Sequence, residues 1–162
     1  MRRCIDVSEL FNDIDNLYDL PEIKEKNQIF IDVNIYLLQT NLNTEQIIDT
    51  LKQYKCKKGY TKVILDTTKV DNNWKKSKFH LTNYENLPYL NDKAKYLGSR
   101  KNLIDGNVIE PPKININDEG NIEFENGRNR FANLRDLGVK FIPFIICKKE
   151  INYVKEYLRI TT

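Results

Sequence analysis

Histidine and cysteine are scarce in this sequence, and their scarcity argues against several kinds of chemistry. His80 is the only histidine among 162 residues. A metal cluster built on histidines and a Ser-His-Asp triad are therefore close to excluded, and we predict no metal-binding cluster. The three cysteines, at positions 4, 56 and 147, are widely spaced and form no C-x-x-C pair. This spacing is typical of reduced thiols rather than of a disulfide framework or a zinc site.

Long hydrophobic runs are also missing from the sequence. No apolar stretch approaches the roughly 18 residues that a membrane-spanning helix needs. The chain opens with Met-Arg-Arg-Cys, but Asp6 and Glu9 stand where a secretory signal requires apolar residues. We therefore expect a soluble, cytoplasmic (intracellular) protein with no membrane partner. A hydrophobic content of 40% over 162 residues suffices for one core with an appended subdomain.

Charges of both signs are abundant, but they are unevenly distributed along the chain. Residues 1–51 contain 4 basic and 10 acidic side chains, whereas residues 52–101 contain 13 basic and 4 acidic ones. Residues 102–162 contain 9 of each. The basic middle third suggests an anionic partner, such as DNA or RNA, or an acidic protein face. A lysine-rich surface that only contacts water explains the same distribution equally well.

The N-terminal third has the pattern of a helix, a strand and a second helix. A capping-box pattern starts the first helix at Asp6, and Pro21 ends it. Residues 29–38, with the sequence IFIDVNIYLL, alternate between apolar and polar side chains and predict a strand. Asn43 can cap the second helix, whose apolar face is formed by Ile47, Ile48, Leu51 and Tyr54.

Strand and helix patterns continue through the middle of the chain. TKVILD, residues 61–66, predicts a strand, and residues 88–103 predict an amphipathic helix that Gly98 weakens. Residues 67–85 are polar and fit neither period.

The signals become sharper after Pro111 and Pro112, which force an extended backbone. KINI and IEFE read as the two arms of a β-hairpin around the turn NDEGN. A short helix follows and ends at Gly138, and KFIPFII predicts a core strand in which Pro143 favours an edge position or a bulge. KKEINYVKEYL predicts a closing helix. The alternation of elements predicts a single α+β or mixed α/β domain.

FENGRNRFANLRDLG, residues 124–138, places two arginines at the start of that short helix. Positive charges are unfavourable there, because the N-terminal end of the helix dipole is itself positive. Gly127 permits a positive φ, and the first N–H groups of a helix have no partners inside it. Glycine and helix start together can form an anion seat. Arg128 and Arg130 can grip a phosphate at this seat with paired N–H groups.

An ion-pairing role for Arg130 is the alternative interpretation. The side chain can pair with Glu123, Glu125 or Asp136 and so tie the helix to the hairpin. The tripeptide NGR is common in proteins, and the residues alone leave both interpretations open.

Residues 104–146, with the sequence IDGNVIEPPKININDEGNIEFENGRNRFANLRDLGVKFIPFII, resemble the ParB/sulfiredoxin superfamily. The family pattern is a helix, a G-x-x-x-x-P approach to a hairpin, the motif [D/N]-G-[R/H]-H-R-x-x-A-x-x-x-x-G and a final strand reading I-P-V. The matching residues, in order, are Gly106, Pro111, Pro112, Asn126, Gly127, Arg128, Arg130, Ala132, Leu134, Gly138, Ile142 and Pro143. The resemblance covers about residues 86–150. It implies an α+β domain with a small mixed sheet over residues 61–162, preceded by an α/β extension of unknown role over residues 1–60.

This resemblance implies a nucleotide-phosphate site at Gly127, Arg128, Asn129 and Arg130, with ATP, ADP or CTP as the nucleotide. Sulfiredoxins bind ATP and reduce a sulfinic acid, and ParB-type partition proteins bind and hydrolyse CTP while they clamp DNA. Other relatives resemble nucleases, free-serine kinases or plasmid fertility-inhibition proteins. Partition proteins also carry a helix-turn-helix domain after this fold; because the sequence ends at residue 162, we do not expect a full partition protein.

Two departures from the family pattern bear on activity. Arg128 stands where sulfiredoxins carry their catalytic cysteine, which argues against sulfinic acid reduction. Asn129 replaces the family histidine and cannot supply a proton that titrates near pH 7. Whether the protein is an enzyme therefore stays open at the level of the sequence.

Other residues around the motif are candidates for the same site. Glu110 and Asp105 lie near the approach to the hairpin, which faces the phosphate loop in relatives, and Glu110 is the better candidate for a catalytic carboxylate. A carboxylate there can hold Mg²⁺ together with nucleotide phosphates, although Asp105 with Gly106 can also be a simple turn. Arg100 and Lys101, at the end of the preceding helix, can reach the phosphates or merely satisfy the helix C-terminus.

Three functions follow from these patterns. The first is a ParB-like protein that binds nucleotide phosphates and interacts with nucleic acid, with NTPase or nuclease-type activity. In this case Trp74, within NNWKKSKFH, can stack on a base or simply pack in the core. The second is a non-catalytic interaction module that holds a protein partner through residues 1–60. The third is a phosphotransferase that acts on a small molecule or a protein.

Overall fold

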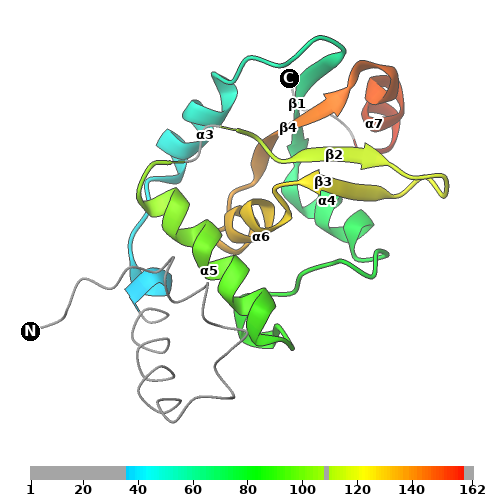
Figure 1. The fold of residues 1–162 in the computed structure, drawn as a ribbon. Coiled ribbons are helices and arrows are strands. Elements are labelled where there is room, and N and C mark those ends of the chain that lie inside the picture. Colours follow the sequence, from blue (N-terminus) through cyan, green and yellow to red (C-terminus); the bar gives the residue numbers. More distant parts are fainter. Residues whose placement is uncertain (1–35, 108–109, 159–162) are drawn as a thin grey trace, which may run out of the picture.

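The computed structural model describes residues 36–107 and 110–158 (Figure 1). The helix predicted from Asp6 and most of the strand predicted over residues 29–38 lie outside the described residues. Residues 36–39 are helical, so the strand prediction is wrong for residues 36–38. Leu37 and Leu38 both reach the core, whereas neighbouring residues of a strand point to opposite faces.

The middle of the chain forms most of the predicted elements. Helix α3 spans Thr44–Lys52, and the side chain of Asn43 caps it by accepting a hydrogen bond from the Gln46 amide at 3.1 Å. Strand β1 spans Tyr60–Asp66, and helix α5 spans Leu90–Ile104. A helix that the sequence did not indicate, α4, spans Thr67–Trp74. Its start is fixed because the Asp66 side chain accepts a hydrogen bond from the Lys69 amide at 3.0 Å. A 3₁₀ turn, η2, follows at Tyr84–Asn86.

The C-terminal part confirms the predicted hairpin, short helix, strand and closing helix. The remaining elements are β2 (Lys113–Ile116), β3 (Ile122–Asn126), α6 (Arg128–Asp136), β4 (Phe141–Cys147), η3 (Lys148–Glu150) and α7 (Ile151–Leu158). Gly138, with φ 81°, ends α6 as predicted, and the Val139 amide donates back to the Leu134 carbonyl at 3.1 Å.

The four strands form one mixed sheet in the order β1-β4-β2-β3, so the fold is α+β as predicted. β4 pairs antiparallel with β1 and parallel with β2, and it therefore lies inside the sheet. The edge position predicted from Pro143 is wrong for the strand as a whole. The Ile145 amide donates to the Pro112 carbonyl at 2.9 Å, where β2 begins. Amides of alternate residues in a strand point to the same side, so the Pro143 nitrogen points to the same side as the Ile145 amide. Strand β2 begins only opposite Ile145, so it has not yet begun at the level of Pro143, and proline costs the sheet no hydrogen bond there.

The core lies on one face of the sheet, to which Val63, Leu65, Ile142, Phe144 and Ile146 contribute. Helices α4 and α6 pack on this face, and α5 packs on α6 (Figure 1). Trp74 of α4, Phe124 of β3, Phe131 of α6 and Phe144 of β4 meet in an aromatic cluster with ring centroids 4.6–6.4 Å apart. At the rim of the sheet, the Ile122 amide of β3 donates to the Asn73 side chain of α4 at 2.7 Å.

Leu37 and Leu51, from the predicted extension over residues 1–60, belong to this same core. The domain boundary near residue 60 stays a prediction, and the proposed partner surface falls largely outside the described residues. Within residues 36–107 and 110–158, no helix is long and apolar enough to cross a membrane.

Candidate functional site

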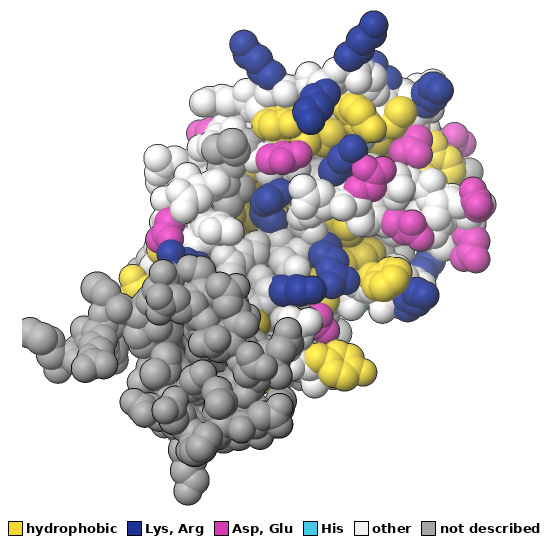
Figure 2. Space-filling view, in the orientation of Figure 1, with side chains coloured by type: hydrophobic (Ala, Val, Ile, Leu, Met, Phe, Trp, Pro, Cys, Tyr) yellow, Lys and Arg dark blue, Asp and Glu magenta, His cyan; other side chains and the backbone are white. Residues whose placement is uncertain are grey.

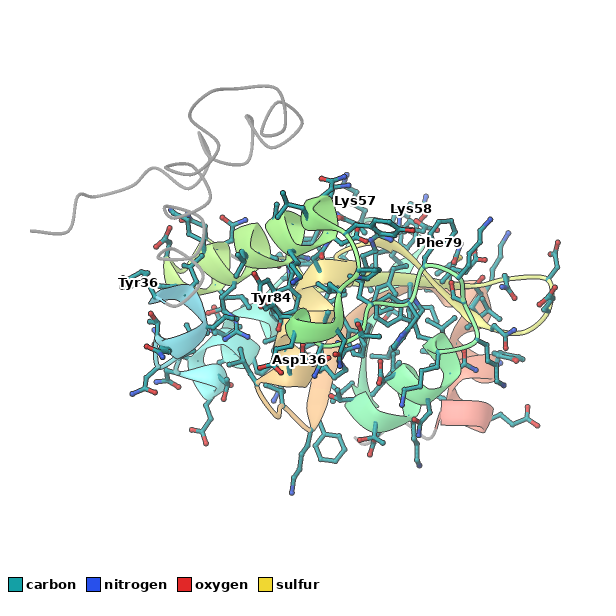
Figure 3. All side chains as sticks on the ribbon, turned by 90° about the horizontal axis from the view of Figure 1, so that it is seen from below. Tyr36, Lys57, Lys58, Phe79, Tyr84 and Asp136 are labelled. Carbon is teal, nitrogen blue, oxygen red and sulfur yellow. The ribbon has the colours of Figure 1, made fainter. Side chains whose placement is uncertain are left out.

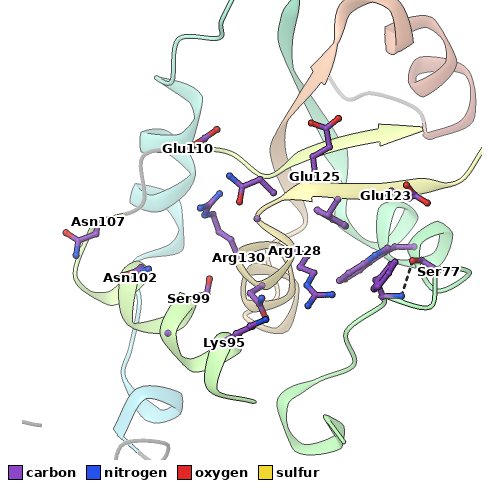
Figure 4. Close-up of a pocket in the computed structure, with 17 residues that line it drawn as sticks. Ser77, Lys95, Ser99, Asn102, Asn107, Glu110, Glu123, Glu125, Arg128 and Arg130 are labelled. Atoms are coloured by element: carbon purple, nitrogen blue, oxygen red, sulfur yellow. Dashed lines mark hydrogen bonds between the residues drawn. The ribbon is translucent and has the colours of Figure 1, made fainter. Parts of the chain in front are cut away.

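A cleft with a volume of about 810 Å³ opens beside the junction of β3 and α6 (Figure 4). Its volume lies within the range of roughly 300–1,000 Å³ that is usual for small-molecule sites. One wall is the segment Glu123–Arg130, and the α5 wall consists of Lys95, Gly98, Ser99 and Asn102. Trp74, Ser77 and Phe79 line one part of the cleft, and Asn107 and Glu110 line another.

Gly127 forms the floor of the predicted anion seat and has the backbone conformation that the seat requires. Its φ of 82° is left-handed, and its carbonyl accepts the first helical hydrogen bond of α6 from the Phe131 amide at 2.9 Å. The amides of residues 128–130 therefore lack partners within the helix. No side chain caps α6, and its first turn contains no acidic residue. A Cβ at position 127 would lie 2.9 Å from Pro112 Cα, so only glycine fits.

Arg130 brings a buried, incompletely bonded guanidinium to the seat. Its Nη1 atom is buried and, within the described part of the chain, has no hydrogen-bond partner. Burial lowers the pKa of Arg130, and the negative charge of Glu110 opposes this shift. Figure 4 shows the Arg130 side chain pointing from the start of α6 toward Glu110. The Nη1 end of the guanidinium is thus desolvated without the hydrogen bond that would normally compensate for it.

The ion-pair alternative for Arg130 finds no support in this structure. Glu125 Oε2 lies 2.9 Å from Lys113 Nζ, and Glu123 accepts a hydrogen bond from Asn117 at 3.1 Å. Asp136 accepts hydrogen bonds from the Tyr96 hydroxyl at 2.8 Å and from Arg135 Nε at 2.9 Å. Each carboxylate that the sequence offered to Arg130 is therefore bound to another residue.

Arg128 and Asn129 complete the predicted loop, in different ways. Arg128 lines the cleft, and in the view of Figure 4 it lies between Arg130 and Ser77. The two arginines therefore diverge and flank the seat rather than close on one point. Asn129 also lines the cleft, and its Oδ1 atom is buried and has no partner among the described residues.

Arg100 and Lys101 do not line the cleft. Arg100 is only 4% exposed, and it donates from Nε to Asn133 Oδ1 at 2.7 Å and from Nη2 to the Tyr96 hydroxyl at 3.2 Å. Lys101 Nζ lies 2.5 Å from Asp105 Oδ2 at the end of α5. The helix presents Lys95, Ser99 and Asn102 to the cleft and Arg100 to α6, so we leave Arg100 and Lys101 out of the proposed site.

The buried Arg100 instead belongs to a polar network that supports the loop from behind. Asn133 is fully buried and accepts a hydrogen bond from Arg100. Its Nδ2 atom donates hydrogen bonds to the carbonyls of Tyr96 and Asn129, each at 2.9 Å. Burial, followed by the charge of Asp136, raises the pKa of Tyr96, so its hydroxyl keeps its proton and donates to Asp136. The network ties α5 to the first turn of α6 and holds the backbone at Asn129.

Trp74 lines the cleft but is buried, with 1% of its surface exposed. Its indole packs edge-on against His80 and Phe124 at centroid distances of 4.8 and 4.6 Å. The structure therefore favours the packing role for Trp74 and leaves it little surface for a nucleic-acid base.

Several residues of the cleft were not identified from the sequence. Lys95, Ser99 and Asn102 recur at positions i, i+4 and i+7 of α5, a spacing that places polar side chains on one face of a helix. That spacing could have predicted which face of the helix lines the cleft. Ser77 and Phe79 follow α4 in a stretch without a recognisable pattern, and only the folded chain brings them to the cleft.

The carboxylates near the cleft are spread out. Within residues 36–107 and 110–158, no group of three His, Cys, Asp or Glu side chains could enclose a metal ion. Mg²⁺ that arrives with nucleotide phosphates needs only one or two protein carboxylates, and Glu110 fits that smaller requirement.

Comparisons with known proteins give no assignment: no family model matches the chain, and no curated protein and no solved structure is significantly similar to it.

Proposed function

We propose that this protein binds the phosphate groups of a nucleotide at the start of α6. The observation that carries the proposal is the buried, unpartnered Nη1 of Arg130 beside an uncapped helix N-terminus. Amides and guanidinium together offer donors and positive charge to a single anion. The resemblance of residues 104–146 to the ParB/sulfiredoxin superfamily supports the same site, and we propose that family assignment with it.

We assign the residues of the cleft different roles in binding. The amides of residues 128–130 and the Arg130 guanidinium hold one phosphate, and Arg128 extends the positive surface along the cleft. Glu110, opposite Arg130, is the carboxylate that would share Mg²⁺ with the phosphates. Asn129 offers hydrogen bonds but no titrating proton, so we assign binding and leave hydrolysis unassigned.

Removing the Arg130 guanidinium should weaken binding of inorganic tripolyphosphate, ATP, ADP and CTP by roughly 10- to 150-fold, as expected for a charge-assisted hydrogen bond of about 1.5–3 kcal/mol. The Arg130→Ala variant tests this by calorimetry with and without Mg²⁺. Trp74 is the only tryptophan and lines the cleft, so its fluorescence gives a second readout.

Two variants sharpen that result. Arg130→Lys keeps the charge but loses the planar fork, and it should recover only part of the affinity. Lys149→Ala removes an exposed positive charge outside the cleft and should leave the affinity unchanged. Wild-type protein that binds neither tripolyphosphate nor any nucleotide would contradict the proposed function.

A second candidate function, binding of nucleic acid, is favoured by lysines at one end of the sheet. Strand β1 pairs with β4, and the Lys148 amide after β4 donates a hydrogen bond to the Gly59 carbonyl before β1 at 2.9 Å. This bond brings together the two lysine-rich segments at residues 55–58 and 148–149. We call this group the lysine end; its exposed members are Lys55, Lys57, Lys58, Lys148 and Lys149. Figure 2 shows Lys and Arg side chains gathered along the top of the molecule in that view. The other basic residues of the middle third are distributed over α3, β1, α4, α5 and the segment between α4 and α5.

Binding of duplex DNA or RNA through the lysine end should weaken steeply with salt. Contacts from all five lysines to phosphates give a logarithmic slope of about −4.5, or roughly a 500-fold loss between about 50 and 200 mM salt. Alanine at Lys57, Lys58, Lys148 and Lys149 should flatten the slope by about 3.6 in fluorescence anisotropy. Alanine at Lys69, Lys76, Lys140 and Lys155, which are exposed elsewhere, removes the same charge. Equal effects of the two variants would argue against a defined surface.

A further inference from the structure

Phe79 is an exposed aromatic side chain that lines the cleft. Its side chain is 55% exposed, whereas the other exposed large hydrophobic residues of the described chain, Tyr36, Tyr89 and Phe141, do not line it. In Figure 3, Phe79 and Tyr36 lie on opposite sides of the molecule. A single exposed apolar residue is ordinary on a protein surface, but an aromatic ring in the wall of a cleft is a surface for an apolar ligand group.

Hydrogen bonds hold the backbone that presents the ring. The Phe79 amide donates to Ser77 Oγ at 3.1 Å, and the Ser77 amide donates to the Trp74 carbonyl at 2.8 Å. Phe79 is thus attached to the end of α4, whose Trp74 is part of the core. A ring on such an ordered turn loses little conformational freedom when a ligand contacts it.

Lys78 is a neighbour of the Phe79 ring, but more than half of Phe79 stays exposed. Lys78 Nζ lies 5.1 Å from the Phe79 ring centroid. Phe79 lines the cleft, whereas Lys78 does not. The exposed surface of Phe79 can therefore accept a flat group from within the cleft.

Aromatic surface and anion seat belong to the same cavity. Gly127 and Arg130 form the seat, and Arg128 lies between Arg130 and Ser77 in the view of Figure 4. A ligand that uses both regions carries a phosphate chain at one end and a flat aromatic group at the other. Inorganic phosphate and simple sugar phosphates lack the second feature.

We propose that Phe79 is the platform on which the base of a nucleotide stacks while its phosphates occupy the seat at Gly127 and Arg130. This inference rests on the proposed phosphate-binding function and adds the residue that holds the base. Stacking on an aromatic ring uses a π-face that every base possesses. Affinities for ATP, GTP, CTP and UTP therefore differ much less from one another than each differs from that of inorganic tripolyphosphate.

The test compares ATP with inorganic tripolyphosphate, both with Mg²⁺, by calorimetry on the full chain. The wild type should bind ATP roughly 5- to 150-fold more tightly than tripolyphosphate, the range of base–aromatic stacking. Phe79→Ala should remove this preference and leave tripolyphosphate binding within about twofold, because its seat is untouched. Phe79→Trp should preserve the preference. Phe141→Ala deletes an exposed phenylalanine outside the cleft and should change neither affinity.

Each failure has a distinct signature. If neither tripolyphosphate nor ATP binds, both the phosphate-binding function and this inference fall. If tripolyphosphate binds as tightly as ATP, the phosphate seat stands and the base platform is wrong. If Phe79→Ala still prefers ATP, the base lies elsewhere in the cleft, and the assignment of Phe79 is overturned.

Discussion

Replacing Asn133 by alanine is expected to lower the free energy of unfolding by about 3 kcal/mol, the upper end of the range for a buried hydrogen-bonding group that loses its partner. Asn133 is fully buried, and its Oδ1 atom accepts a hydrogen bond from Arg100 Nε at 2.7 Å. Its Nδ2 atom donates to the carbonyls of Tyr96 and Asn129. Alanine removes all three hydrogen bonds and leaves a buried guanidinium with fewer acceptors. Urea denaturation followed by circular dichroism measures the loss.

A double-mutant cycle with Arg100 tests whether the cost arises from the network. In Asn133→Ala with Arg100→Met, the charge and its partner leave together, so the double variant should lose less stability than the sum of the two single variants. Asn152→Ala, at an exposed asparagine of α7, should stay within about 0.5 kcal/mol of the wild type. Additive single effects would show that Arg100 and Asn133 act independently.

Gly127→Ala should both destabilise the protein, by about 2–4 kcal/mol, and abolish its affinity for tripolyphosphate. The new Cβ would lie 2.9 Å from Pro112 Cα, a backbone atom that cannot move without shifting the hairpin approach. It would also lie 2.9 Å from Arg130 Nη1, the atom that we assign to the phosphate. Thermal denaturation and calorimetry report the two effects separately.

Gly138→Ala is the matched control for this variant. Gly138 follows the last turn of the same helix with φ 81°, nearly identical to the 82° of Gly127, and a Cβ there would meet no atom within 4 Å. It should therefore show only the cost of a left-handed alanine, about 1–2 kcal/mol, with unchanged tripolyphosphate binding. Equal losses of affinity in both variants would mean that backbone strain, and not the close approach at residue 127, controls the seat.

The elements around the anion seat were predicted correctly because turn residues and apolar spacing within each element determine them. The turn residues of NDEGN fixed the hairpin, and apolar spacing with Gly138 fixed the extent of α6. The left-handed conformation of Gly127 followed from its place between a strand and a helix. The same reasoning found α3, β1 and α5.

Properties that depend on distant parts of the chain escaped prediction. Helix α4 buries only Thr67, Val70 and Trp74 and so shows no extended apolar period. Arg100 looked like a surface cation, since nothing in its neighbourhood indicated that Asn133, 33 residues away, would accept a hydrogen bond from it inside the core. The place of Pro143 within the sheet depended on where β2 begins beside β4.

The hydrogen bond from the Ile122 amide to the Asn73 side chain has a consequence for how the molecules behave in concentrated solution. β3 is the last strand of the sheet, and the free edge of such a strand can recruit a strand from another molecule. Asn73 occupies one of its amides, while the exposed side chains of Glu123 and Glu125 place negative charge along the same strand. Intermolecular strand addition at β3 would require breaking the Asn73 bond and bringing like charges together. The wall of the cleft is thereby protected against aggregation while it remains open to a small ligand.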